Sequence, residues 1–156
     1  MKNLPIYVQS AKYAMDNSEV EIWRESYQAN MACKRALEGT EELSAVRAYN
    51  SYKTKEFVDG IINEFGIERP LYIIARTIQF KDYDGRFSGK LKDWASEYSF
   101  PDMHSDHDHS WNYISDVHPC ALNEIAKEFI KRQAEQEQIR ENENVDEVDD
   151  EEEMEL

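Results

Sequence analysis

The chain has 156 residues, of which 33 are Asp or Glu and 18 are Lys or Arg, so its formal net charge is −15. This length suits one domain with a hydrophobic core, and a hydrophobic content of 40% argues against a wholly disordered chain. The negative charge argues against direct, non-specific binding of DNA or RNA, because phosphate repels such a molecule.

The acidic residues are concentrated at the C-terminus. Residues 141–156 contain ten Asp or Glu and no Lys or Arg, so the remaining 140 residues carry a net charge of only −5. We therefore predict a helical domain over residues 1–140 and an acidic C-terminal tail over residues 141–156. The tail by itself is either a disordered solubilising end or a mimic of nucleic-acid phosphate that engages a groove lined by Lys and Arg.

The apolar pattern predicts an all-α or mostly α fold, a small single-domain helical bundle with an irregular His-rich loop and a long C-terminal helix. Glycine occurs only five times, and apolar residues recur at helical spacing. No segment is long and apolar enough to span a bilayer, and the first fifteen residues lack the apolar core of a signal peptide. Together with only two cysteines, this predicts a protein of the reducing cytoplasm that does not bind membranes.

The first predicted helix covers residues 5–15, with Pro5 where its missing N–H costs little. Ser18 is the expected N-cap of a longer helix, which should end near Leu37, before Gly39. The residues expected to face the core from this helix are Ile22, Tyr27, Met31 and either Ala32 or Cys33.

The middle of the chain begins with residues 40–52, which are ambiguous. Thr54 is the expected N-cap of the next helix, and Gly66 is its expected end. Pro70 opens the strongly apolar segment 71–80, which we predict to be the central helix, although its β-branched residues make a buried strand the alternative. The helix before Gly66 should bury Phe57, Val58, Ile61, Ile62 and Phe65.

In the C-terminal part, Asp84 and Gly85 predict a turn that precedes another helix. Residues 99–118 lack helical periodicity and form the predicted His-rich loop. A long helix is expected after Pro119. The helix that follows the turn should carry Leu91, Trp94 and Tyr98 on one face, and the long helix should bury Leu122, Ile125, Ala126, Phe129 and Ile130.

The most specific local feature is the run of His and Asp within residues 103–109. All four histidines lie between positions 104 and 118. Imidazole, carboxylate and thiolate groups are ligands of zinc, and a metal supplies the ordering energy that a loop with few apolar residues lacks. We predict a structural zinc site, with a solvated polar loop as the alternative. The predicted ligands are His104, Asp106, His107 and His109, and His118 or Cys120 could complete the shell.

The sequence contains no clear catalytic constellation. We find no HExxH motif, no zinc-deaminase arrangement, no phosphate-binding glycine loop and no nucleophile elbow. A hydrolytic zinc site would need an open coordination position and a base such as Asp108 or Asp116. Residues 82–85 resemble the start of a calcium-binding loop, but the later ligands of such a loop are missing. Cys33 is expected to be a buried structural cysteine and not a nucleophile. We therefore expect a protein that is not an enzyme.

Five short strings, which follow one another in this order along the chain, resemble those of a known domain. They are LPIY at 4–7, YQANMACK at 27–34, EFGIER at 64–69, TIQFKDYDGRFS at 77–88 and VHP at 117–119. Together they resemble a domain of unknown function that conjugative elements and prophages of Gram-positive bacteria encode. The likeness covers most of residues 4–130, and the His-rich run and the acidic tail depart from it.

The resemblance implies a context, a small cytoplasmic protein delivered into a bacterial host cell by a mobile element. Such elements carry anti-defence proteins, and the chain looks like acidic, metal-containing Cas9 inhibitors from streptococcal prophages. Cas9 holds its nucleic acids in positively charged channels. We therefore expect an anti-CRISPR protein that binds a basic surface of type II-A Cas9 and blocks loading of target DNA. The alternatives are a small zinc-dependent hydrolase and another mobile-element interaction protein, for antirestriction or plasmid maintenance.

Overall fold

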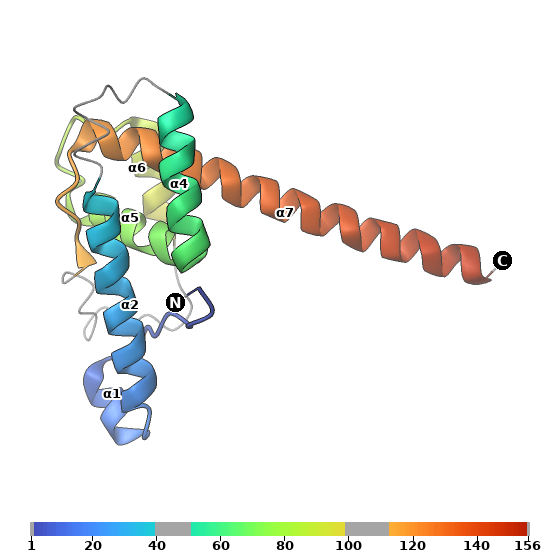
Figure 1. The fold of residues 1–156 in the computed structure, drawn as a ribbon, viewed down its shortest axis with the longest axis horizontal. Coiled ribbons are helices and arrows are strands. Elements are labelled where there is room, and N and C mark those ends of the chain that lie inside the picture. Colours follow the sequence, from blue (N-terminus) through green and yellow to red (C-terminus); the bar gives the residue numbers. More distant parts are fainter. Residues whose placement is uncertain (1, 40–50, 99–112, 156) are drawn as a thin grey trace.

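The structure is a computed structural model that describes residues 2–39, 51–98 and 113–155 (Figure 1). In these ranges it contains six α-helices and no strand, so the predicted all-α fold is confirmed. The helices are α1 (Ala11–Asp16), α2 (Val20–Glu38), α4 (Ser51–Phe65), α5 (Glu68–Phe80), α6 (Gly89–Glu97) and α7 (Pro119–Glu155).

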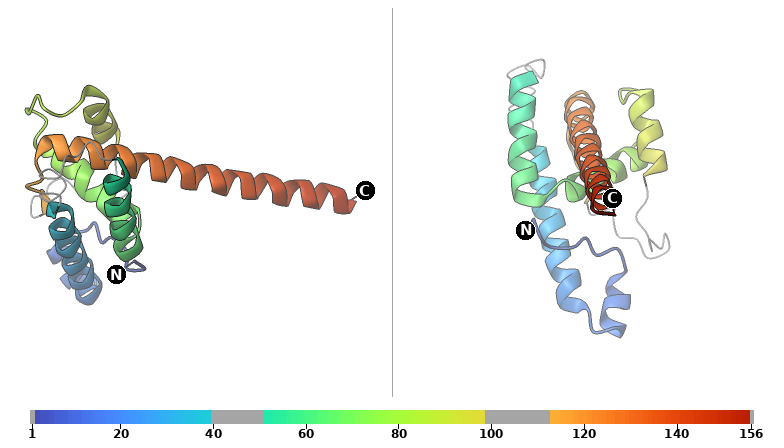
Figure 2. Two further views of the ribbon diagram at one scale, coloured as in Figure 1. Left: turned by 45° about the horizontal axis from the view of Figure 1, so that its top comes forward. Right: turned by 90° about the vertical axis from the view of Figure 1, so that its right-hand side faces the viewer.

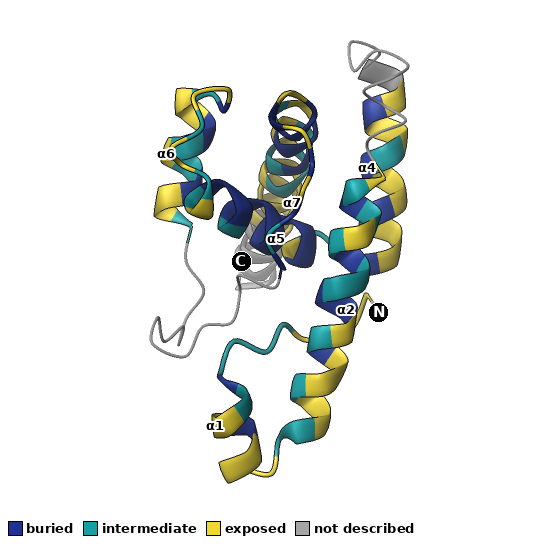
Figure 3. Cartoon of the chain, turned by 90° about the vertical axis from the view of Figure 1, so that its left-hand side faces the viewer, coloured by how far each residue is buried: buried dark blue, intermediate teal, exposed yellow. Residues whose placement is uncertain are grey.

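Helix α5 is the centre of the bundle. It contacts α2, α4, α6 and α7, and Figure 3 shows that buried residues cover nearly all of it. A helix that is apolar around most of its circumference must be enclosed by other elements, which explains why its β-branched residues are tolerated here. The central helix predicted from the sequence is confirmed, and the strand alternative is wrong. The buried residues of α5 are Arg69, Pro70, Leu71, Tyr72, Ile73, Ile74, Ala75, Thr77 and Ile78.

The N-terminal segment is irregular where a helix was expected. Helix α1 begins only after Ser10, whose hydroxyl accepts a hydrogen bond from the Tyr13 N–H at 3.0 Å. Upstream of it, the carbonyl of Pro5 accepts a hydrogen bond from the Arg69 guanidinium at 2.9 Å. Residues 4–10 contain no helical turn, and their backbone is held by this long-range contact instead of a helix ladder, so the prediction of a helix over residues 5–15 is wrong for its first half.

Helix α2 also starts differently from the prediction. Ser18 has a φ of 58°, whereas an N-cap residue is extended, and Glu19 occupies the cap position instead. Ile22 is 46% exposed, because this end of α2 extends beyond the body towards α1 (Figure 3). The core-facing residues further along α2 include Cys33 and Leu37, and both are completely buried.

Helix α4 begins at Ser51, so Thr54 lies within the helix and is not its cap. Residues 40–50 of the ambiguous segment lie outside the described residues. Val58, Ile61 and Phe65 are buried, and Phe57 and Ile62 pack against the core, as predicted. Gly66 ends the helix with a φ of 81°, a left-handed conformation that favours glycine, so this predicted stop is confirmed.

The C-terminal half follows the prediction closely. The turn at Asp84 and Gly85 is present, and Ser88 caps α6 by accepting a hydrogen bond from the Leu91 N–H at 3.2 Å. Trp94 and Tyr98 pack against the core beside the buried Leu91. The apolar stripe of α7 is buried as predicted, with Ile130 only partly so.

Helix α7 is the most unusual element of the fold. Its 37 residues correspond to a length of about 55 Å, and its C-terminal part projects far from the bundle (Figures 1 and 2). Every side chain from residue 134 to residue 143 is exposed, so the helix leaves the body after residue 133. In the described part of the chain, no helix combines the length and the apolar character that crossing a membrane requires.

Candidate functional site

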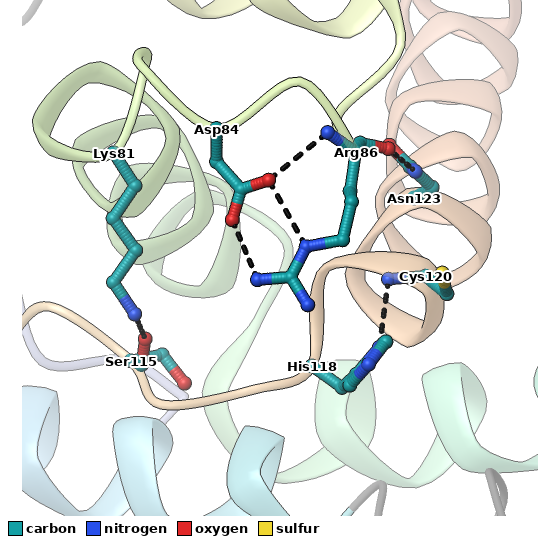
Figure 4. Close-up of polar contacts among 7 residues, drawn as sticks. All are labelled: Lys81, Asp84, Arg86, Ser115, His118, Cys120 and Asn123. Atoms are coloured by element: carbon teal, nitrogen blue, oxygen red, sulfur yellow. Dashed lines mark hydrogen bonds and ion pairs between the residues drawn. The ribbon is translucent and has the colours of Figure 1, made fainter.

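The predicted zinc ligands His104, Asp106, His107 and His109 lie in residues 99–112, outside the described residues. The structure does place His118 and Cys120, the two residues that could complete the shell, at the first turn of α7 (Figure 4). Within the described ranges, no group of three or more His, Cys, Asp or Glu side chains is arranged to hold a metal ion. A zinc site would therefore have to draw most of its ligands from the loop.

His118 precedes the first residue of α7 and caps the helix. Its Nδ1 atom accepts a hydrogen bond from the Cys120 N–H at 3.1 Å. Because a backbone N–H can only donate, Nδ1 carries the lone pair and the proton of the neutral ring is on Nε2. A zinc ion needs a lone pair, so neither ring nitrogen of His118 can bind it while the cap is in place. Cys120 has an exposed side chain and remains the better candidate to complete a shell.

We expect native, tag-free protein to contain zinc that is lost on replacing His104, His107 and His109 by alanine. Cys120→Ser should weaken zinc binding, whereas His118→Ala should not, because the His118 lone pair is used by the cap. Metal analysis of the purified variants measures this directly. Zinc-free native protein would contradict the site, and His118→Ala protein that loses its zinc would contradict the assignment of Cys120. If the zinc is structural, chelation should also lower the unfolding temperature.

The turn between α5 and α6 is organised by one carboxylate. Asp84 Oδ1 accepts hydrogen bonds from the backbone N–H and from Nε of Arg86, at 2.9 and 3.0 Å, and Oδ2 accepts one from Nη2 at 2.8 Å (Figure 4). Both carboxylate oxygens thus contact Arg86, which fits a structural turn and not a cation loop. Asn123 joins this turn to α7, because its amide donates to the Arg86 carbonyl at 2.8 Å.

The hydrogen bonds from Arg86 lower the pKa of Asp84 to about 2. Because the folded-state pKa is below that of an unfolded chain, the stabilisation is present above the ordinary carboxyl range and is lost as the pH falls towards 2. We expect an NMR titration of the Asp84 carboxyl to have its midpoint near pH 2. In Arg86→Gln the midpoint should return towards 4. An unchanged midpoint in that variant would show that Arg86 is not the cause.

The segment that leads into α7 is fixed to α5 by two side chains. Thr77 Oγ1 accepts a hydrogen bond from the buried Ser115 N–H at 3.0 Å and donates one to the Ile73 carbonyl at 2.8 Å. Lys81 Nζ donates to the Ser115 carbonyl at 2.9 Å (Figure 4). These contacts position the start of α7 and thereby set the direction in which the helix leaves the body.

A second polar centre lies at the opposite end of α5, and the sequence analysis did not identify it. Arg69 is only 2% exposed. Its Nε donates to Asn30 Oδ1 at 2.7 Å, and its Nη1 and Nη2 atoms donate to the carbonyls of Leu4 and Pro5 at 3.1 and 2.9 Å. We call these four residues the arginine clasp. It ties the N-terminal segment to α2 and α5, and burial lowers the pKa of the guanidinium from its usual value.

The arginine clasp joins three of the strings that carried the family resemblance. Leu4 and Pro5 come from the first, Asn30 from the second and Arg69 from the third. The local sequence gives no clear signal, because Arg69 stands next to Glu68, directly before the apolar segment that Pro70 opens. Its partners are far away in the sequence, so spacing alone could not reveal the contact.

A pocket of about 290 Å³ adjoins the arginine clasp. We call it the corner pocket, because it lies between the N-terminal segment, the α4–α5 junction and the part of α7 that leaves the body. Polar and apolar groups share its wall about equally. Its lining consists of residues 2–6, Ile62, residues 65–69 and Gln136.

A family model described as protein of unknown function (DUF3849) matches residues 6–139. The chain belongs to this family. No curated protein and no solved structure matches the chain. The predicted resemblance to a domain of unknown function is confirmed, whereas the mobile-element origin and the likeness to Cas9 inhibitors stay predictions.

The DUF3849 match contains the helical body and ends before the acidic run. The ten acidic residues at 141–155 therefore lie beyond the matched region. The backbone of α7 continues as a helix to Glu155, so the acidic residues follow one another along a helical axis. The division into a domain over residues 1–140 and a separate tail stays a prediction, but the two share one helix.

The two cysteines of the chain have opposite environments. Cys33 is completely buried near Arg69, and burial raises the pKa of its thiol to about 12. Cys120 is exposed. Because the thiolate is the reactive form, we expect one thiol of the native protein to react rapidly with a disulfide reagent at pH 8, and the second only after unfolding. Cys120→Ser should abolish the rapid reaction. A rapid reaction that persists in this variant would contradict the burial of Cys33.

Proposed function

We propose that the protein is a non-enzymatic inhibitor that binds a basic, nucleic-acid-binding surface of a protein partner. The observation that supports this proposal is the free part of α7. The helix leaves the body after residue 133, its described side chains are exposed from there on, and ten acidic residues follow at 141–155.

The charge density of this helix is close to that of nucleic acid. Residues 141–155 span about 22 Å of helix axis, because an α-helix rises about 1.5 Å per residue. Ten acidic residues over that length correspond to about one negative charge per 2.2 Å. Double-stranded DNA carries about one per 1.7 Å. A groove of Lys and Arg that holds a duplex is therefore a suitable partner for this helix.

Among proteins with a basic, nucleic-acid-binding surface, the family resemblance favours a Cas9-type effector. Its positively charged channel holds guide and target nucleic acid, and an acidic helix in that channel would compete with target DNA. The proposal places the protein in the cytoplasm of a bacterial host cell. It includes no catalytic residue, and a zinc ion in the His-rich loop would be structural.

The test is competition between the chain and target DNA for a Cas9–guide RNA complex. We expect the chain to bind the complex, to reduce DNA cleavage and to lose its effect when target DNA is bound first. The matched control replaces the acidic residues of 141–155 by Asn and Gln, which keeps the size of each side chain and removes its charge. Absence of binding to any CRISPR effector would refute the Cas9 proposal, and pull-down from a host lysate would then identify another basic target.

A further inference from the structure

Asp–Gly dipeptides are chemically labile points of a protein backbone, and this chain contains two of them. They are Asp59–Gly60 and Asp84–Gly85. The backbone nitrogen of such a glycine attacks the Cγ atom of the preceding aspartate with little hindrance, because glycine has no Cβ atom. In both dipeptides an arginine pairs with the aspartate, Arg132 in the first and Arg86 in the second.

The reaction converts an ordinary peptide bond into an isoaspartyl bond. A bond forms between the Gly85 nitrogen and the Asp84 Cγ atom, the N–H proton and the carboxyl OH leave as water, and a five-membered succinimide results. Water then adds to the ring and breaks the bond between the Gly85 nitrogen and the main-chain carbonyl carbon of Asp84. The protonated carboxyl is the reactive form, because hydroxyl is a far better leaving group than the oxygen of a carboxylate.

The backbone protects the first dipeptide but not the second. Asp59–Gly60 lies within α4, where the helix fixes the backbone dihedrals and commits the glycine N–H to the helical ladder, which opposes ring closure. Asp84–Gly85 lies in the turn between α5 and α6, and Gly85 is exposed. Among the described residues, no atom beyond its chain neighbours lies within 4 Å of a Cβ atom placed at Gly85, so the ring has space to form.

Arg86 restrains the carboxylate of the second dipeptide at both oxygens. Asp84 Oδ1 accepts hydrogen bonds from the backbone N–H and the Nε of Arg86, and Oδ2 accepts one from Nη2 at 2.8 Å (Figure 4). Such charge-assisted, bidentate contacts are strong, and they must break before either oxygen leaves as water. The same contacts lower the pKa of Asp84 to about 2, so the reactive protonated form is scarce at neutral pH.

We propose that Arg86 protects the Asp84–Gly85 bond from isomerisation, and that this turn becomes a site of isoaspartate formation when the arginine releases the carboxylate. The consequence reaches α7. Asn123 accepts a hydrogen bond from the Ser88 N–H at 3.2 Å and donates one to the Arg86 carbonyl at 2.8 Å. Because isoaspartate adds one atom to the backbone of the turn, it would displace these partners and loosen the start of α7. The inference is independent of the proposed function.

The test is the rate of isoaspartate formation at position 84 on prolonged incubation at about pH 6, above the ordinary carboxyl pKa. Mass spectrometry of tryptic peptides with electron-transfer fragmentation distinguishes isoaspartate from aspartate, and the peptide with Asp59–Gly60 is the internal reference. We expect Arg86→Gln to isomerise at least about tenfold faster than the native protein, because the protonated fraction of Asp84 rises as its pKa returns towards its ordinary value. Arg86 is 58% exposed, so this variant should fold.

Two control variants separate the carboxylate contact from general mobility of the turn. Asn123→Ala removes the bonds between the turn and α7 but keeps the pair of Asp84 and Arg86, so it should isomerise as slowly as the native protein. The double variant Gly85→Ala, Arg86→Gln should also be slow, because the added methyl group hinders ring closure. The fold accepts alanine there, since the φ of Gly85 is not positive and its surroundings are open.

A synthetic peptide of residues 78–90 gives the rate without the folded turn, and the native protein should be much slower than this peptide. A native rate equal to that of the peptide or of Arg86→Gln would overturn the protection. If Asn123→Ala were as fast as Arg86→Gln, mobility of the turn and not Arg86 would control the reaction, and the proposal would fall. A double variant as fast as Arg86→Gln would exclude the succinimide route. Circular dichroism checks that each variant keeps the native helix content.

Discussion

Replacing Arg69 by methionine is expected to lower the free energy of unfolding by about 4 kcal/mol, the largest effect of any single substitution considered for this protein. Methionine keeps most of the apolar stem but donates no hydrogen bond. The carbonyls of Leu4 and Pro5 and the Oδ1 atom of the buried Asn30 would each lose a donor. Urea denaturation followed by circular dichroism measures the loss.

The matched control for this prediction is Arg35→Met on α2. Arg35 is exposed, so its replacement should change the free energy of unfolding by less than about 0.5 kcal/mol. If Arg69→Met were as stable as the control, the arginine clasp would not hold the N-terminal segment. Increased proteolysis of residues 2–10 in Arg69→Met would locate the damage in that segment.

Ending the chain after Arg140 is expected to slow association with a basic partner by about tenfold or more at low ionic strength. The truncation removes ten acidic residues and reduces the formal net charge from −15 to −5. The helical body should unfold as before, because the side chains of α7 from residue 134 to residue 143 are exposed and the body does not depend on them. Stopped-flow or surface-plasmon kinetics at several salt concentrations measures the association rate.

The full-length variant with Asn and Gln in place of the acidic residues separates charge from length. It should associate as slowly as the truncated chain, and the difference from the native protein should disappear at high salt, where the charges are screened. An association rate that does not respond to either change would assign recognition to the body alone.

Local patterns in the sequence were sufficient for much of the fold. The apolar stripe of α7 identifies a helix, because side chains at helical spacing must share a buried face, whereas the apolar run of α5 was compatible with a helix or a buried strand. Gly66 was identified as a stop for an equally local reason, since its left-handed conformation suits glycine. The errors occurred where a distant residue intervened. The Pro5 carbonyl bonds to Arg69, and Ile22 is exposed because that end of α2 extends beyond the body of the bundle (Figure 3).

The candidate sites also differ in whether local sequence or only long-range contacts reveal them. The loop ligands His104, Asp106, His107 and His109 were found from sequence because they are neighbours in the chain, and their arrangement stays a prediction. For His118, the structure adds a contact that spacing does not reveal, because its Nδ1 atom accepts a hydrogen bond from the Cys120 N–H at the start of α7. The arginine clasp and the corner pocket combine residues from four separate segments, and no single window of sequence contains them.

The sequence by itself determined the helical class and the concentration of negative charge at the C-terminus, since composition and local periodicity carry this information, whereas the structure decided between helix and strand for residues 71–80. Only the tertiary structure decided how that charge is presented. The acidic residues continue a helix that Asn123 joins to the α5–α6 turn and whose leading segment is held by Thr77 and Lys81, so the charge projects from the bundle in a set direction. Charge depends on which residues are present, whereas direction depends on long-range contacts that no local pattern encodes.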